Sequence, residues 1–165
     1  MDRLTFSQPI IGVMGGGKAS HLHIDMAYEL GSYIAKNNYI LLNGGKNKGI
    51  MEASSKGAFE SKGLTIGIIP DSNSENLSQY IKIPIITGIG DARNQINILS
   101  STIVTAFQGG PGTVSEIAFA LKFKKKIILI DFYPGEFIDA FINKTVFLVN
   151  NPKEAIEKIN DLLKK

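Results

Sequence analysis

The sequence predicts an α/β protein built as a three-layer, Rossmann-like, doubly wound parallel sheet of about seven strands. Short runs rich in isoleucine, leucine and valine recur without strict alternation, which is typical of strands covered on both faces. Stretches with apolar residues at helical spacing lie between these runs. Because strand and helix alternate, the strands are expected to be parallel and joined by right-handed crossovers.

The predicted strands and helices follow one another along the chain, and the sequence shows no linker and no internal repeat. The strand runs span residues 10–14, 39–43, 65–69, 83–87, 102–107, 126–130 and 146–149. The apolar faces of the expected helices carry Ile24, Ala27, Leu30, Gly31 and Ile34, then Met51, Ala58 and Phe59, then Ile96 and Leu99, then Ile117, Ala120, Leu121 and Phe123, and finally Ala155, Ile159, Leu162 and Leu163. Asn151 as N-cap and Pro152 at the first position define the start of the last helix.

Length and composition indicate one domain over residues 1–165. The 165 residues weigh 17.9 kDa and 44% of them are apolar, enough for a single core. With 20% charged residues and a mean hydropathy of +0.07, the chain is expected to be soluble and cytoplasmic, without a membrane span or an export signal. The lack of cysteine excludes disulfides, thiolate nucleophiles and sulfur-ligated metal sites.

The positive charge of the chain does not point to nucleic acid. The net charge is +3 and the pI about 9.0, but sixteen of the eighteen cations are lysines. They are scattered except for Lys122, Lys124, Lys125 and Lys126, which we interpret as a solvated helix end. Aromatic and basic residues do not alternate as they do in base-stacking modules, so no nucleic-acid partner is expected.

Glycines gather directly after four of the predicted strands. In this architecture ligands lie outside the carboxyl ends of the strands, where the winding reverses. Glycine lets the backbone approach a ligand closely, and each glycine turn leads into a helix whose first N–H groups attract an anion. The sequence therefore predicts an anion-binding pocket at one end of the sheet. The clusters are Gly15, Gly16 and Gly17, then Gly44 and Gly45, then Gly88 and Gly90, and then Gly109, Gly110 and Gly112.

Arg93 is one of only two arginines, and the other is Arg3 in the N-terminal tail. Asp91 is a reasonable N-cap, which places Arg93 in the first turn of the third helix. A cation there opposes the helix dipole and destabilises the helix by about 0.3 to 1 kcal/mol. A bound anion would make the interaction favourable. The alternative is an exposed arginine that reaches into water.

Glu116 has two interpretations. Thr113 and Glu116 in GGPGTVSE have the spacing of a capping box, in which the threonine caps the fourth helix and the glutamate bonds back to it. In the other interpretation the carboxylate lies beside the anion pocket, where it orients water or bonds a ligand hydroxyl or amine. Both can hold at once.

Two further features are open to a functional and a structural interpretation. Lys46 and Lys48, which flank Asn47 after the second strand, either add positive charge to the pocket or face water. The polar segment 70–80 is either a mobile surface loop or a lid over the site.

Several common functional motifs are absent. The sequence contains no G-x-x-x-x-G-K-[ST] and no G-x-S-x-G, which argues against a P-loop triphosphatase and a serine hydrolase. The first turn is not G-x-G-x-x-G, and Asn43 stands where a dinucleotide site would carry an acid. His21 and His23 are two residues apart and point to different faces, so they are expected to be structural or solvent-facing and no metal site is predicted.

Two segments resemble the signatures of a known superfamily. NGGKNKGIMEA (43–53) and QGGPGTVSE (108–116), with Arg93 between them, resemble the GGG-x-x-G-x-M-G and PGG-x-GT-x-x-E motifs of the LOG (LONELY GUY) phosphoribohydrolases, often labelled lysine-decarboxylase-like. The resemblance covers roughly residues 10–130. It implies that Arg93 and Glu116 occupy the catalytic positions of enzymes that split a nucleoside 5′-monophosphate into free base and ribose 5-phosphate.

The departures from these motifs look closer to a sister group, the molybdenum cofactor carrier proteins. Gln108 replaces a proline, Ser115 replaces the first of two acids, and Asn43 and Glu52 replace two glycines. The tripled glycine after the first strand also differs from the cysteine and serine turn of the enzymes. This resemblance implies a protein that binds molybdenum cofactor, a pterin bearing phosphate and an oxidised metal centre, without reacting with it. The phosphoribohydrolase remains the alternative.

The resemblance also implies partners and an assembly. Molybdoenzymes are the expected clients, and a homodimer or homotetramer is expected. The fourth helix is apolar nearly all round from Ile117 to Phe123, which independently favours self-association. The predicted ligand-binding residues are Gly15, Gly16, Gly17, Lys18, Gly44, Gly45, Lys46, Asn47, Arg93, Gly109, Gly110, Gly112, Thr113 and Glu116, with Arg93 and Glu116 catalytic only in a hydrolase.

Overall fold

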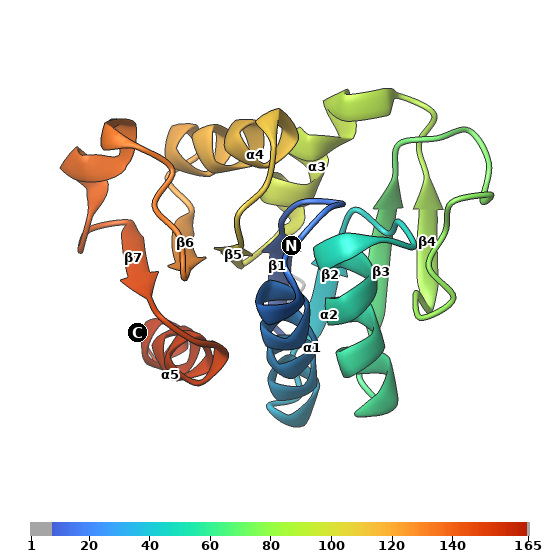
Figure 1. The fold of residues 1–165 in the computed structure, drawn as a ribbon, viewed down its shortest axis with the longest axis horizontal. Helices are drawn as coiled ribbons and strands as arrows, with labels where there is room; N and C mark the ends of the chain where they lie inside the picture. Colours follow the sequence, from blue (N-terminus) through green and yellow to red (C-terminus); the bar gives the residue numbers. More distant parts are fainter. Residues whose placement is uncertain (1–7, 165) are drawn as a thin grey trace, which may run out of the picture.

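The centre of the computed structural model, which describes residues 8–164, is a seven-stranded sheet (Figure 1). Every strand pair is parallel, and the spatial order is β4-β3-β2-β1-β5-β6-β7. The strands are β1 (Ile10–Met14), β2 (Ile40–Asn43), β3 (Thr65–Ile69), β4 (Ile83–Ile86), β5 (Ile103–Ala106), β6 (Lys126–Ile130) and β7 (Val146–Val149). The predicted doubly wound parallel sheet is confirmed.

Helices cover both faces of the sheet (Figure 1). The helices are α1 (His21–Lys36), α2 (Gly49–Glu60), α3 (Arg93–Ser100), α4 (Pro111–Lys122) and α5 (Pro152–Leu163), with the short 3-10 helices η1 (Gly90–Ala92) and η2 (Glu136–Phe141). One face carries α1, α2 and α5, and the other carries α3 and α4. Within residues 8–164, no helix is both long enough and apolar enough to cross a bilayer. Since the strand order runs outward in opposite directions from β1 and β5, the winding reverses between these two strands.

Two apolar layers hold the helices on the sheet. Ile11, Leu30 and Phe107 belong to the layer under α1, α2 and α5, and each is fully buried. Ile98 and Ile117 are fully buried in the layer under α3 and α4. Burial of one such side chain contributes about 1.5 to 3 kcal/mol, so both layers fix the positions of the helix starts at the strand ends.

Strand β4 departs from the predicted burial. All four of its residues are exposed, with Ile83 at 43% and Ile85 at 45% of their full accessibility. The reason is its place at the edge of the sheet, because α3 runs back from β4 over β3 and β1 and does not cover it. The expectation that every strand is covered on both faces is therefore wrong for β4.

Helix α3 is turned opposite to the predicted orientation. Ile96 and Leu99 were expected on its buried apolar face, but they are exposed to 36% and 49%. The buried residues of α3 are Arg93, Asn94, Asn97 and Ile98. Three of these four residues are polar, so the burial of apolar side chains alone does not explain the rotation of this helix.

The helix ends agree better with the sequence. Asn151 caps α5 by accepting a hydrogen bond from the N–H of Glu154 at 2.9 Å, and Pro152 is the first helical residue, as predicted. In the lysine cluster after α4, Lys122 and Lys124 are exposed. Lys125 is half-buried and its Nζ donates to the carbonyl of Ser101 at 2.7 Å, so it also ties down the end of α3.

Candidate functional site

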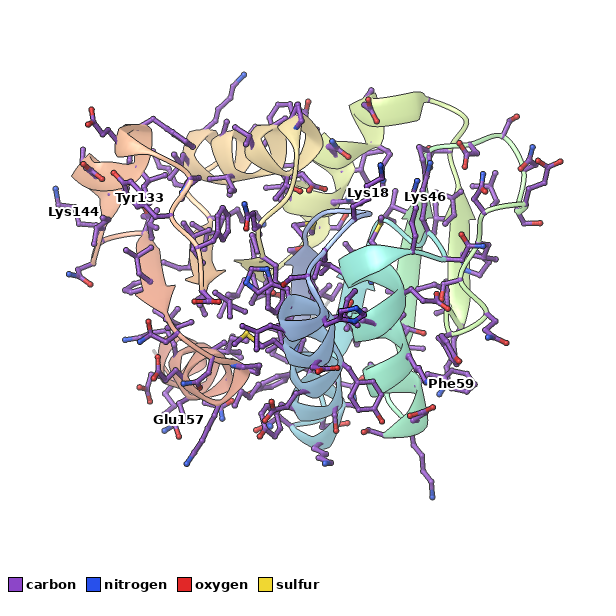
Figure 2. All side chains as sticks on the ribbon, viewed as in Figure 1. Lys18, Lys46, Phe59, Tyr133, Lys144 and Glu157 are labelled. Atoms are coloured by element: carbon purple, nitrogen blue, oxygen red, sulfur yellow. The ribbon has the colours of Figure 1, made fainter. Side chains whose placement is uncertain are left out.

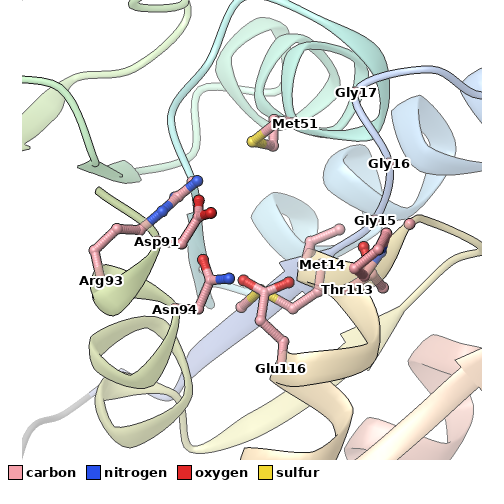
Figure 3. Close-up of a pocket in the computed structure, with 15 residues that line it drawn as sticks. Met14, Gly15, Gly16, Gly17, Met51, Asp91, Arg93, Asn94, Thr113 and Glu116 are labelled. Atoms are coloured by element: carbon pink, nitrogen blue, oxygen red, sulfur yellow. The ribbon is translucent and has the colours of Figure 1, made fainter. Parts of the chain in front are cut away.

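The loops that follow β1, β2 and β5 meet at the carboxyl end of the sheet, where the winding reverses. Together with the first turns of α3 and α4 they enclose a cavity of about 200 Å³ (Figure 3). Its lining comprises Val13, Met14, Gly15, Gly16, Gly17, Gly44, Met51, Asp91, Arg93, Asn94, Gly110, Pro111, Gly112, Thr113 and Glu116. A groove of about 480 Å³ adjoins it and is lined by Gly16, Gly17, Lys18, Ala19, Ser20, His23, Gln108, Gly109 and Gly110.

The loops after β1 and β5 touch backbone to backbone. The N–H of Gly16 donates to the carbonyl of Gln108 at 3.2 Å. A Cβ atom on Gly16 would lie 2.7 Å from the carbonyl oxygen of Lys18, and one on Gly109 would lie 2.8 Å from the nitrogen of Gly16. Any side chain at these two positions would separate the loops, so glycine is needed to bring their peptide groups together around the cavity.

The first turn of α4 presents free peptide N–H groups to the cavity. The helix begins at Pro111, and its N-cap Gly110 has no side chain with which to bond them. The N–H groups of Gly112 and Thr113 therefore have no acceptor inside the helix and favour an anion. The predicted capping box is wrong, because Thr113 is the third residue of the helix and not its cap.

Arg93 points inward, as the anion hypothesis requires. It is only 7% exposed, and its Nη1 donates to the carbonyl of Ile68 at the end of β3 at 2.7 Å. The guanidinium lies against the backbone of Gly44, where a Cβ atom would overlap it. Among the described residues its buried Nε has no hydrogen-bond partner. Burial lowers the pKa of Arg93, and Glu116 and Asp91 act in the opposite direction.

The start of α3 differs slightly from the prediction. Asp91 lies in η1 and does not cap α3, since the N-cap is Ala92 and makes no side-chain bond. Arg93 is the first residue of the helix, so its predicted place in the first turn is confirmed. The Asp91 side chain faces the cavity beside Arg93 (Figure 3). One carboxylate therefore offsets part of the positive charge at the entrance.

Glu116 enters the same cavity from α4 (Figure 3). It is 7% exposed, and its Oε1 accepts a hydrogen bond from Nδ2 of Asn97 at 2.9 Å. Burial raises the pKa of Glu116 to about 7, against the lowering effects of the Asn97 bond and of Arg93. In the part of the chain that the structure describes, no ion pair within 4.0 Å joins Arg93 to Glu116. Both groups thus remain available to a ligand.

The predicted lysines lie at the same end of the sheet but outside the cavity (Figure 2). Lys18 lines the adjoining groove. Lys46 lies 3.6 Å from the carboxylate of Asp71, and the N–H of Asn47 donates to the carbonyl of Asn76 at 2.9 Å. The second-strand loop thus contacts the segment 70–80.

Several predicted glycines have structural positions instead. Gly45 has a φ of 72° and donates its N–H to Oδ1 of Asn43 at 2.8 Å, so it forms the turn that brings Gly44 to the cavity. Gly88 and Gly90 follow β4 at the predicted end of the sheet, but they line neither the cavity nor the groove. Their N–H groups donate to residues 71 and 70 of the neighbouring loop.

The two histidines separate as predicted. His21 is exposed, whereas His23 is buried and its Nε2 lies 3.1 Å from Oδ2 of Asp131. The ring of His23 also packs on Phe107, with the ring centroids 5.9 Å apart. Among residues 8–164, no group of three His, Asp or Glu side chains is placed to hold a metal ion.

Sequence reasoning missed the asparagines that organise the site. Asn43 is fully buried, and its Nδ2 donates to Met51 and Ser55 while its Oδ1 holds the turn at Gly45. Asn97 positions Glu116. The available signal was the spacing of Arg93 and Asn97, which places both on one face of a helix.

Comparisons with known proteins agree with this architecture. The molybdenum cofactor binding protein of Rippkaea orientalis matches with 42% identity and a TM-score of 0.89, over 96% of this chain and 99% of that one. The molybdenum cofactor carrier protein of Chlamydomonas reinhardtii matches with 40% identity and a TM-score of 0.88, also over 96% and 99% of the two chains. An uncharacterised protein of Archaeoglobus fulgidus is 41% identical over 71% of this chain and 76% of its own length.

These matches confirm the resemblance to the carrier group and the Rossmann-like fold that the sequence predicts. The SLOG cluster4 family matches residues 8–156, which is most of the chain. On this evidence the protein belongs to the SLOG cluster4 family.

Proposed function

We propose that this protein binds and carries molybdenum cofactor. The observation that carries the proposal is the buried guanidinium of Arg93, which faces a glycine-lined cavity with an unbonded Nε among the described residues. A buried donor without a partner costs about 1 to 3 kcal/mol, and an anionic ligand would supply the missing acceptor. The similar molybdenum cofactor binding protein of Rippkaea orientalis and the molybdenum cofactor carrier protein of Chlamydomonas reinhardtii support the identity of that anion.

The cavity and the adjoining groove together fit a ligand with a phosphate and a larger ring system. The phosphate is expected between Arg93 and the free N–H groups of Gly112 and Thr113. The cavity of about 200 Å³ is too small for the whole cofactor, and the adjoining groove of about 480 Å³ provides room for the rest. Lys18 lies along that groove and adds positive charge there.

Loading and delivery test the proposal directly. The purified protein is incubated with free molybdenum cofactor, unbound material is removed, and the protein is then mixed with a cofactor-free molybdoenzyme. We expect the loaded protein to restore activity to that enzyme and the Arg93→Ala variant, treated identically, to restore far less. Retention no better than that of an unrelated protein of similar charge would overturn the proposal.

The hydrolase alternative rests on one observation, namely that Arg93 and Glu116 share the cavity. A carboxyl group whose pKa is about 7 can also serve as a general acid or base. The two functions separate when the protein is incubated with AMP and the release of free adenine is measured. A carrier releases none above background, whereas a hydrolase releases base and loses this activity in Glu116→Gln.

Glu116→Gln is informative because the amide keeps the size of the side chain and its oxygen can still accept from Asn97. We expect this variant to load and deliver cofactor at least as well as the natural protein. Loss of delivery in Glu116→Gln, with the fold intact by circular dichroism, would show that the carboxyl group itself is needed to hold or deliver the cofactor.

Molybdoenzyme clients and self-association are part of the same proposal. A carrier must release its ligand to a client, so the groove has to remain accessible after loading. The cytoplasmic location expected from composition stays a prediction.

A further inference from the structure

The groove that adjoins the cavity is continuous with it, because Gly16, Gly17 and Gly110 line both. One ligand can therefore have its phosphate beside Arg93 and its ring system in the groove. The cavity presents hydrogen-bond donors to such a ligand, namely the Arg93 guanidinium and the first peptide N–H groups of α4. A heterocyclic ring that carries N–H groups also needs hydrogen-bond acceptors when it leaves water. An acceptor is therefore expected along the groove.

Four polar side chains line the groove, and only that of His23 belongs to a buried residue. Lys18, Ser20 and Gln108 are exposed. His23 is only 7% exposed. Water competes for the hydrogen bonds of exposed side chains, whereas a buried group bonds a ligand with less competition. The hydrogen bonds of His23 should therefore matter most to a ring bound in the groove.

Three contacts fix the orientation of the His23 ring. The residue lies in the first turn of α1, where its peptide N–H donates to Oγ of Ser20 at 3.2 Å. The ring packs on fully buried Phe107, with the ring centroids 5.9 Å apart. Nε2 lies 3.1 Å from Oδ2 of Asp131. A ring held in this way loses little conformational freedom when a ligand binds.

Asp131 is also held in place. It follows β6 directly, and its N–H donates to the carbonyl of Val149, the last residue of β7, at 2.9 Å. Its φ of 52° lies in the left-handed region, which aspartate and asparagine adopt more readily than most residues. Asp131 does not line the groove, whereas His23 does. The carboxylate therefore meets the His23 ring from outside the groove.

The Asp131 carboxylate determines which nitrogen of the neutral His23 ring carries the hydrogen. An ionised carboxylate can only accept a hydrogen bond, so Nε2 is the donor of this pair. Nδ1 then carries no hydrogen and acts as an acceptor. Among residues 8–164, no donor bonds to Nδ1. The groove thus contains a buried, oriented imidazole with one unused acceptor.

We propose that His23 binds a ring N–H group of the ligand through Nδ1, and that Asp131 is the positioning residue that holds this tautomer. The inference rests on the proposed function, because the pterin ring of molybdenum cofactor carries amino and ring N–H groups. The cavity binds the anionic end of the ligand with donors, and the groove binds the ring with an acceptor. This arrangement favours a ring that presents N–H groups over one that presents only acceptors there.

Two substitutions of His23 separate ligand binding from a purely structural role. The amide oxygen of asparagine lies two bonds from Cβ, as Nδ1 does, and the amide nitrogen of glutamine lies three bonds from Cβ, as Nε2 does. His23→Asn therefore keeps an acceptor toward the ligand but loses the bond to Asp131, whereas His23→Gln keeps that bond and loses the acceptor. We expect His23→Gln to raise the Kd of the cofactor about threefold to tenfold, and His23→Asn to raise it less.

The same two substitutions at His21 are the matched controls. His21 is exposed at the first position of α1, so neither change there should alter the Kd. Circular dichroism verifies that each variant is folded. Equal affinities of the two His23 variants, or tighter binding by His23→Gln, would mean that His23 only supports Asp131 and would overturn the proposal.

Competition by inorganic phosphate locates the effect within the site. Phosphate is expected to occupy the cavity alone, so it should displace the cofactor from the natural protein and from His23→Gln with the same inhibition constant. Weaker competition in His23→Gln would mean that the substitution disturbs the cavity and would overturn the assignment to the ring. A natural protein that does not bind the cofactor contradicts the proposed function itself, whereas an unchanged Kd in His23→Gln contradicts only this inference.

NMR of the ring nitrogens tests the contact without a substitution. The chain has only two histidines, so the signals of His21 and His23 are easily assigned in isotope-labelled, untagged protein. We expect the free protein to hold His23 with its hydrogen on Nε2, and added cofactor to shift the Nδ1 signal of His23 but not that of His21. A hydrogen on Nδ1, or an Nδ1 signal that saturating cofactor leaves unchanged, would overturn the proposal.

Asp131→Asn tests the positioning role by the same measurement. Asparagine tolerates the left-handed backbone, but its amide can donate to Nε2 as well as accept from it. The variant should therefore populate both tautomers of His23 and raise the Kd less than His23→Gln does. If His23 keeps its hydrogen on Nε2 alone in Asp131→Asn, the carboxylate does not set the tautomer and this part of the proposal is wrong.

Discussion

The cavity at Arg93 and a second hollow around Phe147, which we call the Phe147 groove, both contain cations, but they hold them in different ways. The Phe147 groove is distinct from the groove that adjoins the cavity, because it lies at the opposite end of the sheet. Its volume is about 640 Å³, compared with about 200 Å³ for the cavity. It is lined by Lys126, Asn143, Lys144, Phe147, Lys158, Asp161, Leu162 and Lys164. By size and number of cations the groove is the stronger candidate for an anion.

The lysines of the groove already have partners or face water. Nζ of Lys126 donates to the carbonyl of Lys144 at 2.7 Å, and Nζ of Lys158 lies 5.1 Å from the centre of the Phe147 ring. Lys164 lies 3.6 Å from Asp161 at the surface. Solvent and salt screen such exposed charges, and a surface ion pair contributes only about 0 to 1 kcal/mol.

Arg93 differs because the protein has removed it from water and left part of it unbonded. Its Nε has no partner among the described residues, and peptide N–H groups at the start of α4 point into the same space. We therefore expect the anion at Arg93 and not among the lysines around Phe147, because unmet hydrogen-bonding capacity in a buried position favours an anion more than exposed charge does.

The largest expected effect comes from removing the buried cation. Arg93→Ala should weaken cofactor binding by about 1.5 to 3 kcal/mol, or ten- to a hundredfold, because it removes charge-assisted hydrogen bonds. Lys158→Ala removes the same charge from the groove and should leave the affinity unchanged. Equilibrium titration of both variants measures the difference, and equal losses would show that the total charge and not the site attracts the ligand.

A smaller effect is expected from the titration of Glu116. The pKa of Glu116 is raised to about 7 by burial, so its carboxyl group gains negative charge as the pH rises from 6 to 8. An ionised carboxylate repels an anionic ligand in the same cavity, and the affinity should therefore fall over this range by at most about tenfold per pH unit. In Glu116→Gln the profile should lose this component, while any titration of the ligand itself remains.

The same raised pKa predicts how the stability of the free protein depends on pH. Because the folded protein holds the Glu116 proton more tightly than the unfolded chain, the free energy of unfolding should decrease as the pH rises from about 4.5 to about 7. Above pH 7 the loss of stability that comes from ionising the buried Glu116 carboxyl group is complete. Glu116→Gln should therefore be stabilised relative to the natural protein at pH 8 more than at pH 5, as measured by urea unfolding at both values. A difference of the opposite sign would mean that the carboxyl group is not desolvated.

The fold and the place of the site could be predicted from the sequence because they depend on local patterns. Apolar runs mark the buried strands, and the glycines after β1, β2 and β5 stand where the backbones must approach each other. Arg93 was identified because a cation in a first helical turn is locally unfavourable. Each of these signals is readable without knowledge of distant contacts.

The features that were missed depend on contacts between distant segments. The hydrogen bond between Asn97 and Glu116 joins two helices, and the apolar spacing of Ile96 and Leu99 within α3 does not reveal it. Only the polar spacing of Arg93 and Asn97 indicates which face of α3 is buried. The capping box predicted at Thr113 was wrong, but the true start of α4 could have been predicted from the local sequence. Proline is favoured at the first position of a helix, and Pro111 is the first residue of α4. The exposure of β4 follows from its edge position, which depends on the order of all seven strands.

The smallest effect should come from substitution of Lys46. This lysine is near the site, but like the lysines of the Phe147 groove it is partly exposed and already has a partner. It is paired with Asp71 at 3.6 Å, and both side chains are partly exposed at 23% and 32%. Lys46→Ala should change the cofactor affinity less than threefold and the free energy of unfolding by less than about 1 kcal/mol. A tenfold loss of affinity would place Lys46 in the site and would mean that the segment 70–80 rearranges when the ligand binds, because Lys46 must leave Asp71 to reach it.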